Sequence, residues 1–278
     1  MVEALGFDSA WTYDHLAWRA LAQKPWFATF SVLAAAATAT QRIRIGTMVT
    51  TPNFRHPLLA AKEAMTLDDI SGGRLTLGIG SGSYDSGDLS ILADHSMTQR
   101  ERSNRFAEFV ELVDHLLREG VTTFDGTFYR VVNAPMIPGC IQQPRVPFVI
   151  AAAGPNAMHI AARYGAGWST VGSADWSGTQ SIEDCANLLR KQVDQLRRAC
   201  DAIGRDVADI ERIFMPSPVS CVNPLTSIDI FMRTAEAVSQ VGISQLVVHW
   251  PRKNAPYASD PAVIEDVATE AFPIVAEM

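Results

Sequence analysis

Asp14 and His15 are adjacent residues of types that can carry acid–base chemistry, and they follow a predicted strand at 9–13. A histidine at such a strand end can take a proton from a substrate and return it, so the pair could carry general acid–base chemistry. A helix cap beside a surface histidine is the structural alternative. The local spacing alone leaves both interpretations open.

Two glycine-containing segments could hold a ligand through their backbone. The segment Gly80-Ser81-Gly82-Ser83 follows a predicted strand at 75–79, and glycine lets backbone N–H groups approach a bound molecule closely. The segment Ala153-Gly154-Pro155-Asn156-Ala157 lies between a predicted buried strand and a helix, whose N-terminus attracts phosphate. A tight turn that binds nothing is the alternative for both segments.

These residues need strands that end at a common edge, and strand-like and helix-like segments alternate along the chain. We predict seven strands, at 9–13, 43–49, 75–79, 146–152, 167–171, 210–215 and 245–249. Helices are expected at 25–38, 57–71, 99–119, from 156, 181–202, 227–240 and 261–277, with loops at 80–98 and 120–147. Strict alternation favours a parallel sheet covered on both faces. In a chain of 278 residues, this alternation predicts an α/β fold with one (β/α)8 TIM-barrel domain spanning 1–278. The functional site of such a barrel lies at the C-terminal ends of its strands.

Three helices have clear sequence signals. Pro57 can open the helix at 57–71, and its apolar face is expected to carry Leu58, Leu59, Lys62, Met65 and Leu67. The helix at 99–119 is expected to bury the stripe Phe106, Phe109, Val110, Val113, Leu116 and Leu117. Ser227 is the expected N-cap of the helix at 227–240.

Composition excludes several classes of protein. The net charge of −7 comes with scattered basic residues, so we expect no nucleic-acid partner. The longest apolar run, 27–39, is too short to span a bilayer, and no signal peptide is visible, so no membrane partner is expected. Four widely spaced cysteines predict free thiols and a cytoplasmic location. His95 and His115 lack ligand partners at metal-binding spacing, so no metal is expected.

The order of motifs resembles the luciferase-like monooxygenase superfamily, the bacterial luciferase type of flavin and F420-dependent oxidoreductase. The resemblance covers essentially the whole chain and is carried by ALGFDS at 4–9 with Asp14-His15, GTMV at 46–49 with RHP at 55–57, TLD at 66–68 with SGGRL at 71–75, LGIGSG at 77–82, RER at 100–102, FAE at 106–108, AAGP at 152–155, AAR at 161–163 and VVHWP at 247–251. Each motif is weak alone, and the order and spacing together are specific.

The resemblance implies a deazaflavin site at the mouth of a barrel. It places His15 beside the reactive ring as the catalytic acid/base and assigns cofactor contacts to Asp14, Met48, Val49, Thr51, Ser81, Gly82, Ala153, Gly154, Asn156 and Ala157. It also implies a non-prolyl cis peptide between Met48 and Val49. Ser83, His249 and Trp250 are candidates for the substrate pocket.

Some features depart from the family pattern. A glutamate follows the second glycine in the family's sugar-phosphate dehydrogenases, whereas this chain has Ser83, which puts that substrate in doubt. The first glycine of the phosphate turn is replaced by Ala153. The family also has a strand ahead of residues 3–7, and we interpret its absence as a late start or a fragment.

Coenzyme F420 is the expected cofactor, with hydride transfer to or from a small-molecule substrate in a homodimer. An FMN-dependent monooxygenase that uses molecular oxygen is the alternative. A flavin-binding protein without turnover and a metal-dependent barrel hydrolase are further hypotheses. Arg55 could clamp an anion or pair with a neighbouring carboxylate, and we keep it out of the catalytic set.

Overall fold

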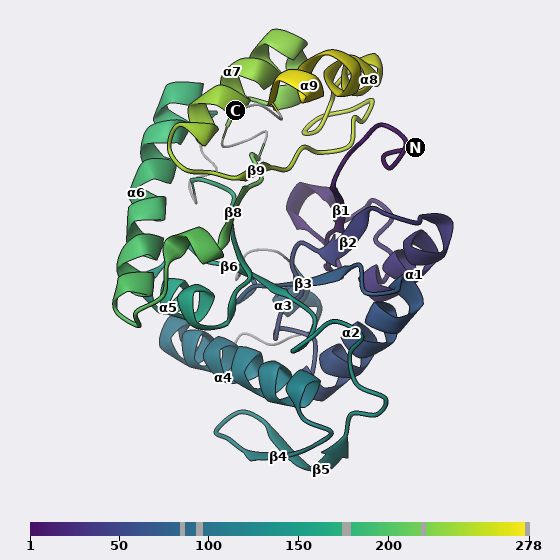
Figure 1. Ribbon diagram of the computed structural model, residues 1–278, viewed down its shortest axis with the longest axis vertical. Helices are drawn as coiled ribbons and strands as arrows, with labels where there is room; N and C mark the ends of the chain where they lie inside the picture. The colour runs from purple at the N-terminus through teal and green to yellow at the C-terminus, as the bar shows by residue number, and fades with distance from the viewer. Residues whose placement is uncertain (84–86, 93–96, 174–178, 218–220, 276–278) are drawn as a thin grey trace. The chain divides into compact units, whose positions relative to one another are not determined.

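The computed structural model describes residues 1–83, 87–92, 97–173, 179–217 and 221–275 (Figure 1). The chain divides into two compact units, one formed by residues 8–151 and the other by residues 1–7 with 152–278. Each predicted site residue belongs to one of these units. The prediction of one domain over residues 1–278 stays a prediction.

Parallel strands form the inside of the unit at 8–151. They run in the order β1 (Ser9–Thr12), β2 (Arg44–Thr47), β3 (Leu75–Ile79) and β6 (Phe148–Ala151). The helices α1 (Thr29–Ala39), α2 (Pro57–Ser71) and α4 (Gln99–Arg118) pack one against the next on the outer side of these strands (Figure 1). Short helices follow β1 and β3, namely η1 (Arg19–Leu21) and α3 (Asp88–Ile91).

Helix α2 begins and ends as the sequence predicts. Pro57 occupies its first turn, and the chain leaves the helix through Gly72 at φ 64°, a conformation that glycine adopts without strain. The expected apolar face is wrong at Leu59, which is 62% exposed. The small residues Ala60, Ala61 and Ala64 are buried instead, because a helix that packs closely on its neighbours uses side chains of low volume.

Helix α4 buries the whole stripe expected for it. All six predicted side chains are at most 5% exposed, and Leu112 joins them. Thr98 and Glu101 form a capping box at its start, which satisfies N–H groups that would otherwise lack partners. This rigid helix carries further side chains toward the ends of β2 and β3.

A hairpin in the unit at 8–151 was not expected. Residues 120–147 were predicted to be irregular, but they contain the antiparallel pair β4 (Val121–Asp125) and β5 (Arg130–Pro135). The hairpin extends away from the parallel strands at the bottom of Figure 1. Exposed and buried residues alternate along both strands, and Val121 and Val132 are more than half exposed. The sequence of the hairpin therefore contains no continuous apolar run.

The second unit repeats the alternation of strand and helix. Its parallel strands run in the order β7 (Gly167–Thr170), β8 (Glu211–Phe214) and β9 (Gln245–Leu246). The helices are α5 (Pro155–Tyr164), α6 (Ile182–Asp201) and α7 (Ile228–Ser239), with short turns η2 (Val207–Asp209) and η3 (Pro224–Thr226). The side chain of Ser227 caps α7, as predicted.

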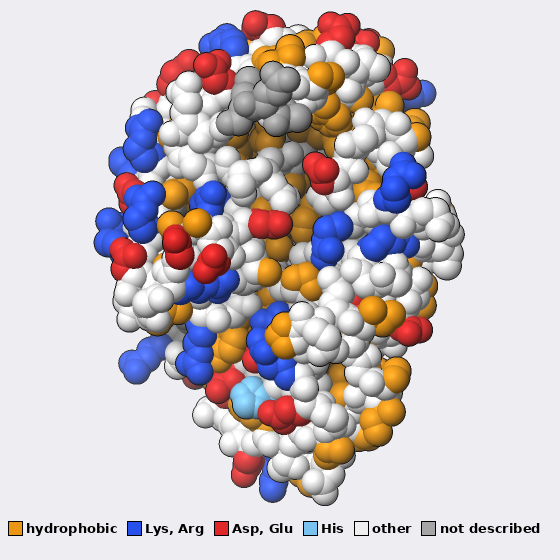
Figure 2. Space-filling model, in the orientation of Figure 1, with side chains coloured by type: hydrophobic (Ala, Val, Ile, Leu, Met, Phe, Trp, Pro, Cys, Tyr) orange, Lys and Arg blue, Asp and Glu red, His pale blue; other side chains and the backbone are white. Residues whose placement is uncertain are grey.

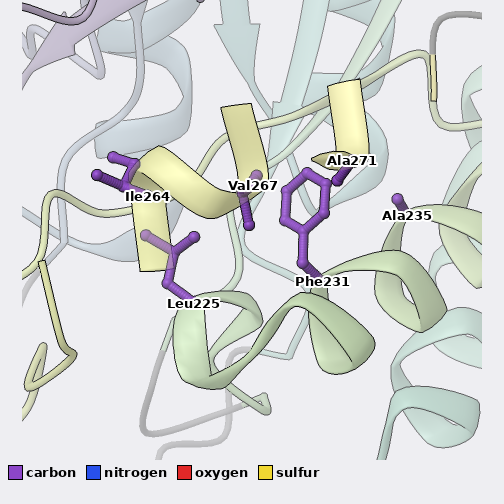
Figure 3. Close-up of a cluster of buried hydrophobic side chains, with 6 residues drawn as sticks. All are labelled: Leu225, Phe231, Ala235, Ile264, Val267 and Ala271. Carbon is purple, nitrogen blue, oxygen red and sulfur yellow. The ribbon is translucent and has the colours of Figure 1, made fainter. Parts of the chain in front are cut away.

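The C-terminal helix closes a hydrophobic cluster in this second unit. It runs through α8 (Ala262–Asp266), the π-helical turn η4 (Val267–Ala271) and α9 (Phe272–Val275), where one helix was expected at 261–277. Figure 3 shows Ile264, Val267 and Ala271 facing Leu225, Phe231 and Ala235. The ring of Phe7 packs edge-on against that of Phe272, with 4.9 Å between the ring centroids, and this contact joins residues 1–7 to the cluster.

Most of the expected element positions are confirmed. The structure has the seven parallel strands that were predicted, with the fourth beginning at Phe148 and the last ending at Leu246. The helix expected at 25–38 begins only at Thr29, and the loop expected at 80–98 contains α3. All four cysteines are free thiols.

Acidic and basic side chains are interspersed on the face shown in Figure 2. On α6, Arg197 and Asp194 form an exposed ion pair at 2.6 Å. Among the described residues, no helix is long and apolar enough to cross a bilayer. The same part of the chain has no group of three potential metal ligands.

Candidate active site

His15 lies just beyond β1 and is held by a buried carboxylate. His15 Nδ1 is 2.7 Å from Asp88 Oδ2, and the Asp88 side chain is 1% exposed. The backbone N–H groups of Leu16 and Ala17 donate to Asp88 Oδ1 at 2.7 and 3.4 Å, which fixes the carboxylate at the start of α3. An ionised carboxylate accepts the Nδ1 proton, so the lone pair of the neutral imidazole lies on Nε2.

Aromatic rings surround the imidazole of His15. The centroid distances to Trp26, Tyr13 and Trp18 are 5.8, 6.2 and 6.5 Å. The His15 side chain is still 17% exposed, so a small molecule can reach it. Such surroundings favour an organic substrate with apolar surface next to the reacting group.

Asp14 is engaged on the protein side rather than beside His15. Arg55 donates to it through Nε at 2.6 Å and Nη2 at 2.9 Å, and Thr50 Oγ1 donates at 2.7 Å. Arg55 also donates to Glu63 at 2.8 Å, which confirms the expected pairing with a carboxylate. Burial lowers the pKa of Arg55, but the hydrogen bond and charge of Asp14 and the charge of Glu63 outweigh it, so the pKa lies above its ordinary value. Burial also raises the pKa of Glu63.

The predicted cis peptide between Met48 and Val49 is present, directly after β2. The Val49 side chain lies against Gly78 and Gly80, where a Cβ atom on Gly80 would collide with it. Gly78 in β3 and Gly80 just after it therefore make room for the Val49 side chain. The arrangement sets an apolar surface at the C-terminal ends of β2 and β3.

Thr51 and Gly82 are brought together at this edge. A Cβ atom on Gly82 would collide with Thr51 Oγ1 and with Asn53 Nδ2, and Gly82 has φ 75°, so only glycine suits the position. Thr51 is 2% exposed and accepts a hydrogen bond from the Asn53 N–H at 3.2 Å. Ser81 is half-buried and Ser83 is exposed beside them.

The predicted phosphate turn lies in the second unit, at the start of α5. Gly154 is the N-cap residue, no side chain caps the helix, and a Cβ atom on Gly154 would meet only open space. Trp168 Nε1 donates to the Ala152 carbonyl at 2.8 Å, which fixes the turn beside β7. Ala153, Gly154 and Asn156 are exposed and Ala157 is half-buried, so the positive end of the helix is accessible to an anion.

His249 and Trp250 follow β9 in the same unit. His249 Nε2 donates to the Pro216 carbonyl at 3.1 Å, and its ring packs on Tyr257 at 4.2 Å. Burial lowers the pKa of His249 to about 4, with a smaller opposing effect of the Pro216 carbonyl, so the ring is neutral at pH 7. Trp250 is 43% exposed. A substrate contact of either residue stays a prediction.

Each unit offers one feature that could hold part of a ligand. In the unit at 8–151, the Val49 side chain and the buried edge at Thr51 and Gly82 suit an apolar planar ring. In the other unit, the N-terminus of α5 has no side-chain cap and has open space at Gly154, which suits an anionic group. The cofactor contacts assigned to Asp14, Met48, Val49, Thr51, Ser81, Gly82 and residues 153–157 remain predictions.

Asp88 is a functional candidate that the sequence did not reveal. It lies 73 residues from His15 in a segment expected to be a loop, where a single acidic residue gives no signal of its role. Asn53 and Arg105 were also missed. Arg105 Nη2 donates to Asn53 Oδ1 at 2.8 Å, and nothing in their local sequence pairs them.

Comparison with known proteins finds relatives that are F420-dependent dehydrogenases. The chain is 37% identical over 180 residues to an F420-dependent glucose-6-phosphate dehydrogenase of Beutenbergia cavernae, which takes in 60% of this chain and 49% of that protein. The chain thus spans about half the length of the curated relatives it matches.

Solved structures share the fold. An F420-dependent secondary alcohol dehydrogenase, solved with an F420-acetone adduct, is similar with a TM-score of 0.80 and 18% identity, over 99% of this chain and 92% of that one. The monooxygenase RslO1 from Streptomyces bottropensis is similar with a TM-score of 0.74 and 22% identity, over 98% and 89%. These likenesses establish the α/β barrel fold of the luciferase-like type. Residues 1–223 match the family described as luciferase-like monooxygenase, and this protein therefore belongs to that family.

Proposed function

We propose that this protein is an oxidoreductase that transfers hydride between coenzyme F420 and a small alcohol or carbonyl compound. The observation that carries the proposal is the pair of His15 and Asp88, which leaves Nε2 as the basic atom among aromatic rings at a strand end. The F420-dependent relative and the F420-dependent structural neighbour support the choice of cofactor.

The chemistry of the pair follows from its geometry. F420, when bound, supplies the two-electron hydride acceptor. His15 Nε2 takes the hydroxyl proton of the alcohol, and Asp88 stabilises the imidazolium that results through the Nδ1 hydrogen bond of 2.7 Å. In the reverse direction His15 returns the proton to the carbonyl oxygen. The ring would rest against the Met48–Val49 peptide, the glycine segment at Ser81 and Gly82 would contact the polar tail, and the turn at 153–157 would hold the tail phosphate.

A neutral alcohol suits this site better than a sugar phosphate. Ser83 stands where the family's sugar-phosphate dehydrogenases have glutamate, and three aromatic rings lie next to His15. A homodimer in the cytoplasm is part of the same proposal.

The first experiment is a fluorescence titration of the protein with F420 and with FMN, each oxidised and reduced. Tight binding of F420 without FMN supports hydride transfer and directs the substrate search to alcohols. Binding of FMN alone, with oxygen-dependent turnover, would favour the alternative monooxygenase, a class to which one structural neighbour belongs. Stoichiometric binding without turnover of any alcohol, enone or aldehyde would make the protein a cofactor binder.

Two substitutions test the assigned roles. We expect His15→Ala to lower kcat by about 10²- to 10⁴-fold, the usual contribution of a general base. Asp88→Asn should lower kcat by a similar factor, up to about 10⁴-fold, because an amide can donate to Nδ1 and leave the imidazole proton on Nε2, which removes the basic lone pair. Both variants should bind F420 with nearly unchanged Kd. If either leaves kcat unchanged, or loses activity only through weaker F420 binding, its assigned role is wrong.

A further inference from the structure

Arg105 of α4 is a buried cation without a carboxylate partner in the described parts of the chain. It is 7% exposed, and its Nη2 donates a hydrogen bond to an amide oxygen, Asn53 Oδ1, at 2.8 Å. Arg105 Nε is buried and has no hydrogen-bond partner among the described residues. An uncompensated charge in the interior is costly, so such a cation calls for an anionic partner.

Asn53 extends the set of unsatisfied donors toward the cofactor edge. The residue is 5% exposed, and its Oδ1 is occupied by Arg105. Its Nδ2 is buried without an acceptor among the described residues, and it faces Gly82, because a Cβ atom there would collide with it. A buried amide N–H without an acceptor costs free energy until a ligand or water supplies one.

Tyr129 adds a third buried donor near Arg105. Its Oη has no partner in the described structure, and burial raises its pKa to about 12, although the charge of Arg105 opposes this, so the hydroxyl keeps its proton. The nearby carboxylate of Glu108 does not neutralise Arg105 by direct contact. Its oxygens accept hydrogen bonds from the backbone N–H groups of Thr127, Phe128 and Tyr129 at 2.7–2.9 Å.

We propose that Arg105 and Asn53 form an anion-binding site beside Gly82 that takes a phosphate or carboxylate group. The two side chains hold more hydrogen-bond donors than acceptors, and one of the donor groups is a guanidinium. They lie at the ends of β2 and β3, next to Gly82. The site consists of residues of the unit at 8–151 alone. Given the proposed function, on which this part rests, the group it binds is an acidic group of the F420 tail.

The cofactor arm of the test compares F420 with FO, the deazaflavin that lacks the acidic tail. Arg105→Gln should weaken F420 binding about 10- to 100-fold, the effect of losing a hydrogen bond to a charged group, and should leave FO binding unchanged. Arg100→Gln is the matched control, because Arg100 is an exposed arginine on the same helix. Equal losses for F420 and FO, or no loss for F420, would overturn the assignment to the tail.

The anion arm needs no cofactor. Inorganic phosphate should raise the melting temperature of the wild-type protein, because a ligand bound only by the folded state stabilises it. Asn53→Asp places a carboxylate next to Arg105 in nearly the same volume. This variant should fold with an equal or higher melting temperature, and its phosphate response should be smaller than that of the wild type.

The outcomes separate this site from the proposed function. If the wild type binds neither F420 nor FMN but Asn53→Asp loses phosphate response, the anion site stands and the proposed function falls. If phosphate stabilises the wild type and Asn53→Asp equally, the donors serve a structural water and the anion site is refuted.

Discussion

Asp14 and His15 are neighbours in the chain, but their side chains serve different partners. Successive side chains of an extended segment point to opposite sides, so one can enter the protein while the next faces the site. Asp14 is bound by Arg55 and Thr50, and His15 is bound by Asp88. The contacts of Asp14 hold the end of the strand in place, and the contact with Asp88 orients His15 as an acid/base.

This division predicts that Asp14→Asn acts on stability. Removing one partner of a buried ion pair costs about 3–5 kcal/mol, and the 16% exposure of the Arg55 side chain reduces this to about 2–3 kcal/mol. We expect a lower melting temperature with F420 affinity within about twofold of wild type. Asp69→Asn, an exposed acid on α2, is the control and should melt like the wild type. An unchanged melting temperature with weaker F420 binding would instead assign Asp14 to the cofactor.

Single residues were predictable where a motif stayed local. The cis bond at Met48–Val49 follows from a short stretch that resembles a known family. Asp88 could not be found in this way, because its contact with His15 spans 73 positions and only the fold brings the two together. Asn53 and Arg105 illustrate the same limit across 52 positions.

Elements were predictable where one face is continuously apolar. The stripe of α4 repeats at helical spacing and is buried as expected, whereas the β4–β5 hairpin escaped because its strands are short and largely exposed. The error at Leu59 has the same origin. The spacing of apolar residues predicts which side of α2 is buried, and contacts with the neighbouring helices determine how far the buried face extends.

The N-terminus of α5 allows stability and binding to be separated within one element. Gly154 has φ −99° and ψ 163°, which any residue can adopt, and open space lies where its Cβ would be. Aspartate is a better N-cap than glycine by a few tenths of a kcal/mol and complements the helix dipole. Gly154→Asp should therefore fold at least as stably as the wild type.

The same substitution should weaken F420 binding, because a carboxylate would repel the tail phosphate at this helix end. We expect a loss of about 10-fold or more in the fluorescence titration, and FO binding should not change. Gly154→Ser, which caps the helix without charge, is the matched control and should bind F420 like the wild type. Equal F420 affinity for Gly154→Asp and Gly154→Ser would remove this turn from the phosphate site.

At the scale of the whole molecule, the alternation of strand and helix was enough to predict the class of fold. The strands β3 and β6 are buried along nearly their whole length and give short apolar runs that are easily recognised, whereas β1 and β9 are only half-buried and were located by their place in the alternation. The net charge of −7 and the intermixed signs in Figure 2 belong to the same scale. His249 is a specific group through which a fall in pH changes the stability of the folded state.

The folded state holds His249 neutral, which makes the stability of the molecule depend on pH. Its pKa is about 4 in the folded protein and near 6.5 when unfolded, so the unfolded state binds the proton first as pH falls. The contribution is fully present above about pH 6.5 and is lost as pH falls toward 4. Between pH 7 and pH 5 this linkage amounts to about 1–2 kcal/mol.

We therefore expect the melting temperature of His249→Gln to fall less between pH 7 and pH 5 than that of the wild type. Glutamine can still donate an N–H to the Pro216 carbonyl but has no proton to gain. His159→Gln is the matched control, since His159 is an exposed histidine on α5 and should leave the pH dependence unchanged. If His249→Gln and the wild type lose equal stability, His249 titrates at an ordinary pH, and its burial against Tyr257 does not keep it neutral.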